Sequence, residues 1–179
     1  MTGLTVSLII IGVRILTAPL ILIWPIGGVI INMIADSLDH PIAQHFGWGL
    51  LGDNHYQYWD KLLDTWYLFF IFLVTRRWKN IRARQTAKVL FFWRFAGFVL
   101  LELAGWERVL VFTPNIFEYF YLFWAIVIRW FPRFTLTTRR LIIALTTIGI
   151  FKIADEIRIH WIHVHFDIIK TYVLPYIIR

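Results

Sequence analysis

The chain has 179 residues, of which 59% are hydrophobic and only 16% are charged. Its mean hydropathy is +0.67, which implies more apolar surface than a soluble domain of this length can bury. The formal net charge of +7 does not require a nucleic-acid partner, because membrane proteins concentrate Lys and Arg in their cytoplasmic loops. The chain contains no cysteine, so disulfides, thiolate metal ligands and cysteine nucleophiles are excluded.

Long apolar stretches predict an all-α, polytopic integral membrane protein with about six transmembrane helices. Sixteen Phe, ten Trp and seven Tyr are typical of the aromatic belts at membrane interfaces. No repeat or linker divides the chain, so we expect 1–179 to form a single transmembrane domain in the cell (inner) membrane. The first span lacks a cleavage-site pattern and should be retained. In chain order, the predicted spans are 4–24, 29–43, 60–75, 89–104, 109–130 and 141–159.

The predicted connections differ in character. A tight Pro-Gly return follows the first span, and a polar and aromatic loop covers 44–59. Residues 160–179 mix apolar and polar side chains, which predicts a C-terminal tail in the membrane interface. The third-to-fourth and fifth-to-sixth connections are strongly basic, and their cations are Arg76, Arg77, Lys79, Arg82, Arg84 and Lys88, then Arg129, Arg133, Arg139 and Arg140.

Four aspartates stand out in or beside these apolar spans. Asp36 and Asp39 are three residues apart and share one helix face, and Asp60 and Asp64 are four apart and share another. Carboxylates near hydrocarbon are costly and usually functional. If the two pairs face each other, they form an all-oxygen site for a hard divalent cation such as Mg²⁺ or Mn²⁺.

A plainer interpretation makes the four acids solvated residues at loop edges. Asp60 would then be a helix cap, although capping does not explain Asp64, four residues inside an apolar helix. The first aspartate pair is expected at the C-terminal end of its helix, where the helix dipole disfavours negative charge. A positive partner is therefore expected, and the candidates are a metal ion, Lys61 or Arg14.

Arg14 is the second unusual residue, because it lies in the middle of the first apolar span. A buried guanidinium suits a bidentate contact with a phosphate, but it would equally suit a structural ion pair with one of the aspartates. His40 and Ala43 continue the helical stripe of Asp36 and Asp39. The small side chain of Ala43 would leave room for a ligand.

The six histidines offer a different metal chemistry. Imidazoles favour Zn²⁺ or Cu²⁺, and His40 and His55 would join the aspartates in a membrane metalloprotein with an extracytoplasmic site. No compact motif of metal ligands is present, so we favour the interpretation of the later histidines as the polar side of an interfacial tail. The six are His40, His45, His55, His160, His163 and His165.

The aspartate segments resemble a family signature. DSLDHPIAQ, from Asp36 to Gln44, and DKLLD, from Asp60 to Asp64, are similar to the two halves of the class I CDP-alcohol phosphatidyltransferase motif. That motif reads D-x-x-D-G-x-x-A-R, a spacer, then G-x-x-x-D-x-x-x-D. Arg14 with the Ala-Pro pair that follows it is similar to a pattern in the family's first helix. The resemblance covers about residues 4–75.

The chain departs from the motif at several positions. His40 stands in place of a glycine, Gln44 in place of an arginine and Tyr56 in place of the second glycine, and the spacer is three residues longer. In an alternative register, Gly52 is the second glycine and Tyr56 falls on a ligand position. We prefer the register that keeps all four carboxylates.

The resemblance implies a bundle like that of the family, with two Mg²⁺ or Mn²⁺ ions held by the four aspartates. It implies phosphotransfer from a CDP-linked lipid or alcohol to an acceptor hydroxyl, in the synthesis of phospholipid head groups. Asp64 would be the general base. The expected partners are membrane lipid, the CDP-linked substrate and a second copy or a larger membrane complex, without nucleic acid. Substrate would contact Arg14, His40, Ala43, Gln44 and Lys61.

The sequence supports a second interpretation of the motif, and it gives two opposite orientations in the membrane. The motif departures also fit a degenerate, non-catalytic homologue that serves as a structural or lipid-binding subunit of a membrane complex. The orientation is also ambiguous. The positive-inside rule makes the basic loops cytoplasmic and places the aspartates outside, whereas the family has its site on the cytoplasmic side.

Overall fold

The computed structural model describes residues 2–46, 49, 56–105 and 109–160, and these residues contain helices and no strand. The prediction of an all-α chain is confirmed for this part of the protein. The helices are α1 (Gly3–Thr17), α2 (Leu20–Ile23), α3 (Pro25–Phe46), α4 (Tyr56–Thr75), α5 (Ile81–Ala104), α6 (Val109–Phe112), α7 (Ile116–Trp130) and α8 (Thr138–His160).

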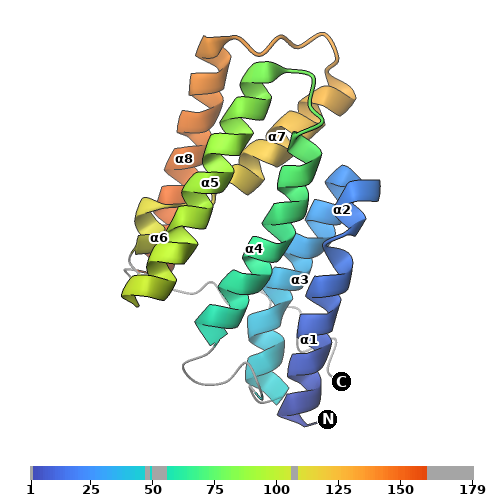
Figure 1. The fold of residues 1–179 in the computed structure, drawn as a ribbon, viewed down its shortest axis with the longest axis vertical. Coiled ribbons are helices and arrows are strands. Elements are labelled where there is room, and N and C mark those ends of the chain that lie inside the picture. Colours follow the sequence, from blue (N-terminus) through green and yellow to red (C-terminus); the bar gives the residue numbers. More distant parts are fainter. Residues whose placement is uncertain (1, 47–48, 50–55, 106–108, 161–179) are drawn as a thin grey trace.

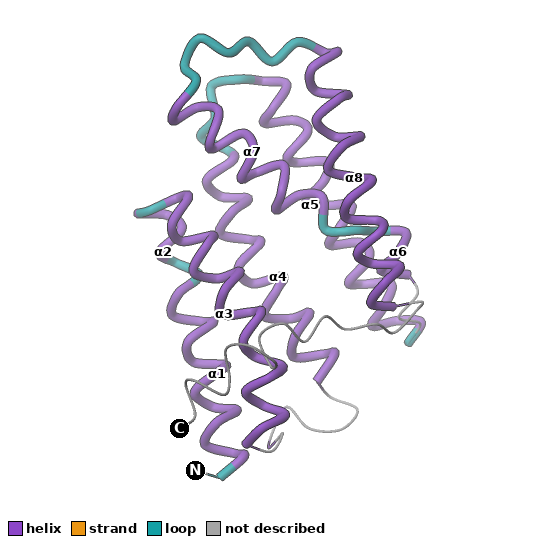
Figure 2. The backbone as a smooth tube through the Cα atoms, turned by 180° about the vertical axis from the view of Figure 1, so that it is seen from behind, coloured by secondary structure: helices purple, strands orange, loops and turns teal. Residues whose placement is uncertain are grey.

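The helices form two groups that meet along α4 (Figures 1 and 2). In the first group α1, α2, α3 and α4 pack against one another, and in the second α5 packs on α7 and α7 on α8. α4 contacts α5 and α7, and α3 also contacts α7. The α4–α5 and α7–α8 connections lie together at the end of the molecule farthest from the N-terminus (Figure 1).

Several helix boundaries differ from the prediction for local reasons. The predicted basic loop at 76–88 is shorter, because the side chain of Asn80 caps α5 by accepting from the Ala83 N–H at 3.0 Å. Arg84 and Lys88 therefore lie on a helix. The predicted span 109–130 is two helices, since Pro114 lies in the break between α6 and α7.

The two aspartate-bearing helices are longer than predicted. α3 continues through Pro41 to Phe46, so Asp36 and Asp39 are not at its C-terminal end and the argument from the helix dipole was wrong. α4 begins at Tyr56, which places Asp60 in its second turn. The interpretation of Asp60 as an N-terminal cap was therefore also wrong.

The main core is aromatic and lies around α7. Phe117, Phe120 and Tyr121 are fully buried, and Trp78 stacks on Tyr121 with ring centroids 5.6 Å apart. A second small cluster, in which Ala43 packs with Val6 and Ile10, joins α3 to α1.

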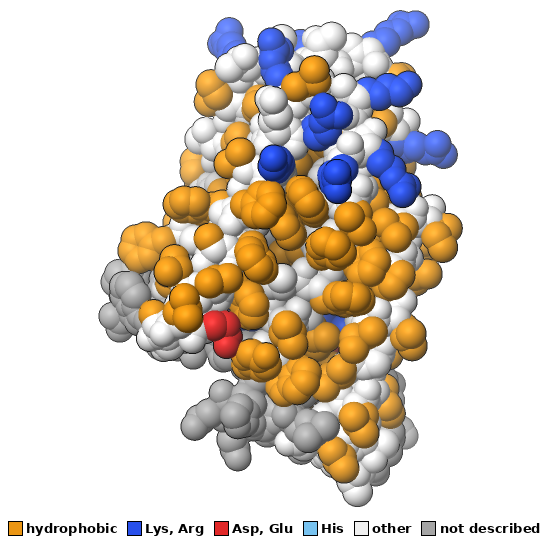
Figure 3. Space-filling model, viewed as in Figure 1, with side chains coloured by type: hydrophobic (Ala, Val, Ile, Leu, Met, Phe, Trp, Pro, Cys, Tyr) orange, Lys and Arg blue, Asp and Glu red, His pale blue; other side chains and the backbone are white. Residues whose placement is uncertain are grey.

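Outside this core the usual distribution of residues is inverted. Leu16, Ile23 and Leu103 are at least 75% exposed, while Arg14 and Glu118 are buried. The space-filling view shows apolar side chains across the middle of one face and Lys and Arg gathered above them (Figure 3). Such extensive exposed apolar surface is unusual for a soluble monomer.

One described helical stretch, Gly3–Ile23, is long and apolar enough to cross a membrane. It corresponds to the first predicted span, although the region around Ala18 and Pro19 separates α1 from α2. The other five spans stay a prediction.

Candidate functional site

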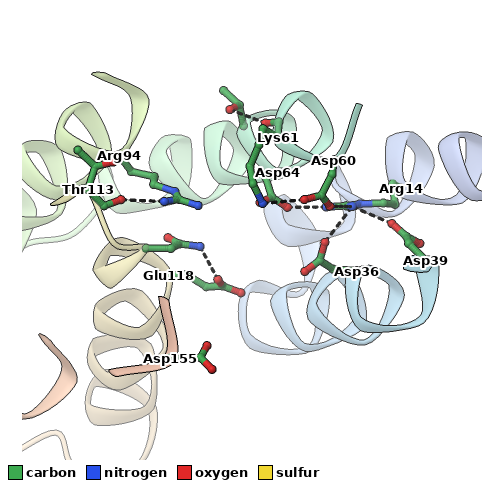
Figure 4. A network of polar contacts seen from close by, with 12 residues as sticks. Arg14, Asp36, Asp39, Asp60, Lys61, Asp64, Arg94, Thr113, Glu118 and Asp155 are labelled. Carbon is green, nitrogen blue, oxygen red and sulfur yellow. Dashed lines mark hydrogen bonds and ion pairs between the residues drawn. The ribbon is translucent and has the colours of Figure 1, made fainter. Parts of the chain in front are cut away.

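The four aspartates surround the guanidinium of Arg14 (Figure 4). Arg14 comes from the last turn of α1, Asp36 and Asp39 from the middle of α3, and Asp60 and Asp64 from the second and third turns of α4. Arg14 is 2% exposed. The structure thus brings together acids from two helices. The helical spacing predicts that each pair shares a face, and the packing of α3 on α4 brings the two faces together. We call these five residues and Lys61 the Arg14 cluster.

Arg14 contacts every one of the four carboxylates. Its Nη1 lies 2.8 Å from Asp36 Oδ1 and 2.7 Å from Asp39 Oδ2. The same Nη1 lies 3.4 Å from Asp60 Oδ1, and Nη2 lies 2.7 Å from Asp64 Oδ1. The sequence left open whether Arg14 pairs with one aspartate or binds phosphate, and in this structure it pairs with four aspartates.

Lys61 adds a second positive charge on the α4 side. Its Nζ lies 2.6 Å from Asp60 Oδ2 and 3.6 Å from Asp64 Oδ2. Both oxygens of Asp60 and of Asp64 therefore face a cation. With every group ionised, four carboxylates against one guanidinium and one ammonium leave a formal charge of −2 on the Arg14 cluster.

Polar contacts fix the register of the three helices beside the cluster. Thr17 on α1 donates a hydrogen bond to Asn32 Oδ1 on α3 at 3.1 Å, and Asn32 Nδ2 donates to the carbonyl of Gly28 at 2.8 Å. On α4, the indole N–H of Trp66 donates to the carbonyl of Ile15 at 3.4 Å. Because Ile15 adjoins Arg14, this contact holds α4 at the level of the cluster.

Gly28 permits the tight return between α2 and α3. A Cβ at this position would lie 2.7 Å from the backbone nitrogen of Ile21, closer than real Cβ atoms come to a neighbouring backbone. The absence of a side chain lets α3 turn back along α1, which places the first aspartate pair beside Arg14.

Three of the carboxylates could hold a metal ion. Asp36, Asp60 and Asp64 each offer an oxygen, and these oxygens lie within 4.8 Å of one another. Ligands on opposite sides of a divalent ion are roughly 4 to 5 Å apart, so the donor set fits one ion with small side-chain movements. Asp39 is not part of this group. Metal binding would require these carboxylates to give up contacts with Arg14, which pairs with all three.

The cluster is open on the side of Asp36. The side chain of Asp36 is 40% exposed, whereas those of Asp39 and Asp64 are 8% and 13% exposed. A ligand that reaches the cluster therefore meets Asp36 first.

Two apolar cavities flank the cluster. One of about 270 Å³ lies between α1 and α3 and reaches Asp39. A larger one of about 500 Å³ lies between α1, α4 and α5. It is lined by Ile15, Trp59, Leu62, Leu63, Thr65, Trp66, Phe69, Phe91 and Phe95.

The remaining predicted site residues have different positions. Ala43 is fully buried against Val6 and Ile10, so helix packing accounts for its small size. His40 is half-buried next to Asp39, and Gln44 is exposed one turn further along α3.

The imidazole alternative falls largely outside the described residues. His55, His163 and His165 are among the positions that the structure does not describe, and so is most of the predicted interfacial tail at 160–179. The predicted Zn²⁺ or Cu²⁺ site through His40 and His55 therefore stays a prediction.

Sequence reasoning missed a second group of buried polar residues beside the cluster (Figure 4). Arg94 on α5 donates to the carbonyl of Thr113 at 2.7 Å. On α7, Glu118 accepts from Asn115 Nδ2 at 2.7 Å. The signal was present, because Arg94 and Glu118 are charges inside predicted apolar spans, as Arg14 is.

Comparison of the chain with protein-family models, with curated proteins and with solved structures finds no match. The resemblance to the class I CDP-alcohol phosphatidyltransferases therefore rests on the motif residues of this sequence alone.

Proposed function

We propose that the protein is a polytopic membrane enzyme whose Arg14 cluster carries out divalent-metal-dependent phosphotransfer from a CDP-linked lipid or alcohol. The observation that carries the proposal is the convergence of four carboxylates from α3 and α4 on the buried guanidinium of Arg14. Acids at such a position in an apolar bundle are seldom retained without a function.

The inverted distribution of residues supports the membrane setting. Many large apolar side chains face outward, while Arg14, Arg94 and Glu118 are buried, which suits a surrounding of lipid and a partly polar interior. The first helical stretch, Gly3–Ile23, has the length and composition of a span.

The charge of the cluster supports a diphosphate substrate. With the two divalent ions that the family resemblance implies, the formal charge of the cluster would change from −2 to +2, and the diphosphate of a CDP-linked lipid would neutralise it. When bound, Mg²⁺ or Mn²⁺ supplies Lewis-acid stabilisation of the phosphoryl oxygens and a template for in-line attack. Asp36, Asp60 and Asp64 are the residues that would hold the ions.

The chain's own groups have distinct tasks in this reaction. Asp64 would take the proton of the acceptor hydroxyl while the hydroxyl oxygen forms a bond to the lipid-side phosphorus. The bond from that phosphorus to the bridging oxygen breaks, and CMP leaves. Arg14 and Lys61 would exchange contacts with carboxylates for contacts with phosphate. The two apolar cavities would take hydrocarbon chains.

A second candidate function is favoured by the position of Arg14. Its guanidinium lies within 3.4 Å of all four carboxylates, so it competes with any metal for their oxygens. Together with the departures at His40, Gln44 and Tyr56, this supports a non-catalytic homologue in which Arg14 is the permanent counter-ion. Such a protein would be a structural or lipid-binding subunit.

Activity and metal binding together separate the candidates. Purified protein would be assayed for CMP release from CDP-diacylglycerol with a panel of polar alcohols, with and without Mn²⁺. CMP release that depends on Mn²⁺ and is lost in Asp60→Asn supports the enzyme. Absence of both Mn²⁺ binding and CMP release contradicts it and supports the non-catalytic candidate. Zn²⁺ bound through imidazole would support a metalloprotein.

A further inference from the structure

The basic end of the molecule contains a hollow that the proposed reaction does not use. It has a volume of about 450 Å³ and lies between the end of α4 and the first turns of α5. Arg76, Arg84 and Lys88 line it together with Gln85, and Phe92 lies at its apolar side. Arg76, Arg84 and Lys88 are all exposed, so the hollow is open to ligands.

A second hollow continues the first along α5. It has a volume of about 670 Å³ and is lined by Gln85, Lys88, Val89, Phe92, Trp93 and Ala96. Gln85, Lys88 and Phe92 belong to both hollows, so the two form one groove. Four of the lining residues recur at intervals of four along α5 and therefore lie on one face of the helix: Arg84, Lys88, Phe92 and Ala96.

The groove changes character along its length. Its outer part, the first hollow, is lined by three exposed cations. Its inner part, the second hollow, is lined by Val89, Phe92 and Trp93, which are also exposed. No carboxylate lines either hollow among the described residues. Figure 3 shows the same order on this face, with Lys and Arg above a broad apolar area. A ligand that fits it has an anionic head and an apolar chain.

We propose that this groove binds an anionic phospholipid. The phosphate of the lipid contacts Arg76, Arg84 and Lys88, and one acyl chain lies along Phe92 and Trp93. Basic side chains next to a membrane attract anionic head groups, and arginine provides paired donors for phosphate oxygens. The proposal uses the membrane setting of the proposed function but none of its chemistry.

The test counts bound lipid by native mass spectrometry of the full chain, with phosphatidylglycerol or phosphatidylcholine as the probe. The double variant Arg84→Gln/Lys88→Gln should retain phosphatidylglycerol roughly tenfold less well or worse. The matched control, Arg133→Gln/Arg139→Gln, removes two exposed cations from the same end of the molecule but outside the groove. It should retain the lipid as the unaltered chain does.

A second variant tests the acyl part independently. Ala96→Trp fills the inner hollow and leaves the cations in place, so it should also weaken phosphatidylglycerol retention. If thermal unfolding shows that the double variant does not fold, Ala96→Trp alone tests whether the groove binds the lipid.

Three results would overturn the proposal. One is equal loss of lipid in both double variants, which would indicate a diffuse charge effect. Another is retention of phosphatidylcholine equal to that of phosphatidylglycerol. The third is complete displacement of the lipid by millimolar inorganic phosphate, which would indicate a site for free phosphate. CMP release is measured in parallel, so any of these three results alongside intact Mn²⁺-dependent release refutes this proposal alone.

Discussion

Arg14 and Asp64 are 50 residues apart in the sequence, yet Arg14 Nη2 lies 2.7 Å from Asp64 Oδ1. This contact joins the first helix to α4 inside the bundle and completes the set of four acids around one guanidinium. Each member also has other partners in the cluster, because Arg14 contacts three further carboxylates and Asp64 contacts Lys61.

Arg14→Met should destabilise the fold by about 3–5 kcal/mol, because four carboxylates lose their shared counter-ion. Added Mn²⁺ should then raise the unfolding temperature of the variant more than that of the unaltered chain, since the ion takes the vacated place. Thermal unfolding in detergent, with and without Mn²⁺, measures both effects. Arg129→Met, which removes an exposed arginine, is the control. A loss of stability no greater than in that control would contradict the central role of Arg14.

Asp64→Asn should abolish turnover while some metal binding remains, because it removes the proposed general base but leaves the other ligands. General-base catalysis contributes roughly 10²- to 10⁴-fold, so the rate of CMP release should fall by at least that factor. Asp155→Asn is the control, since Asp155 pairs with Lys152 on α8, outside the Arg14 cluster. Turnover that survives in the Asp64 variant would remove the assignment.

Lys61→Met should tighten the binding of Mn²⁺ by roughly tenfold, because a positive charge next to two ligand carboxylates is lost. Isothermal titration with Mn²⁺ measures the change. Lys152→Met provides the comparison, since it removes a similar charge from the pair with Asp155. Unchanged affinity in the Lys61 variant would show that the ion binds away from Asp60 and Asp64.

Gly97→Ala should lower the free energy of unfolding by about 1–3 kcal/mol. A Cβ at Gly97 would overlap the side chain of Thr113, the residue whose carbonyl accepts from Arg94. Gly12→Ala is a matched control on α1, where a Cβ meets nothing within 4 Å, and it should raise stability by up to about 1 kcal/mol. Equal effects of the two substitutions on the unfolding temperature would argue against close packing of α5 on Thr113.

Much of the fold followed from residue patterns. The long apolar runs predicted the helices, and the intervals within the two aspartate pairs predicted that each pair shares a face. The boundaries were less predictable. The cap at Asn80 overrode the basic character of the segment after it, and the tertiary packing of α3 tolerated Pro41 inside the helix.

The contacts of Arg14 at the centre of the candidate site were harder to predict than the helix faces around it. The sequence indicated that Arg14 needs a partner, but it could not show that one guanidinium contacts four acids, because that depends on how three helices pack. Arg94 and Glu118 were passed over because each is a single charge in an apolar run. The partner of Arg94 is the carbonyl of Thr113, in the break between α6 and α7, and the sequence does not show that this break packs on α5.

The order of synthesis gives the Arg14 cluster a consequence for assembly. Asp39 and Asp64 emerge from the ribosome 25 and 50 residues after Arg14. In a bilayer, the first helix of the nascent chain would therefore carry an uncompensated cation, which would keep it near the head groups or the translocation machinery. In that setting α3 would supply the first acids and α4 the remaining two, so the first helix would settle into the membrane only as α3 and α4 join it.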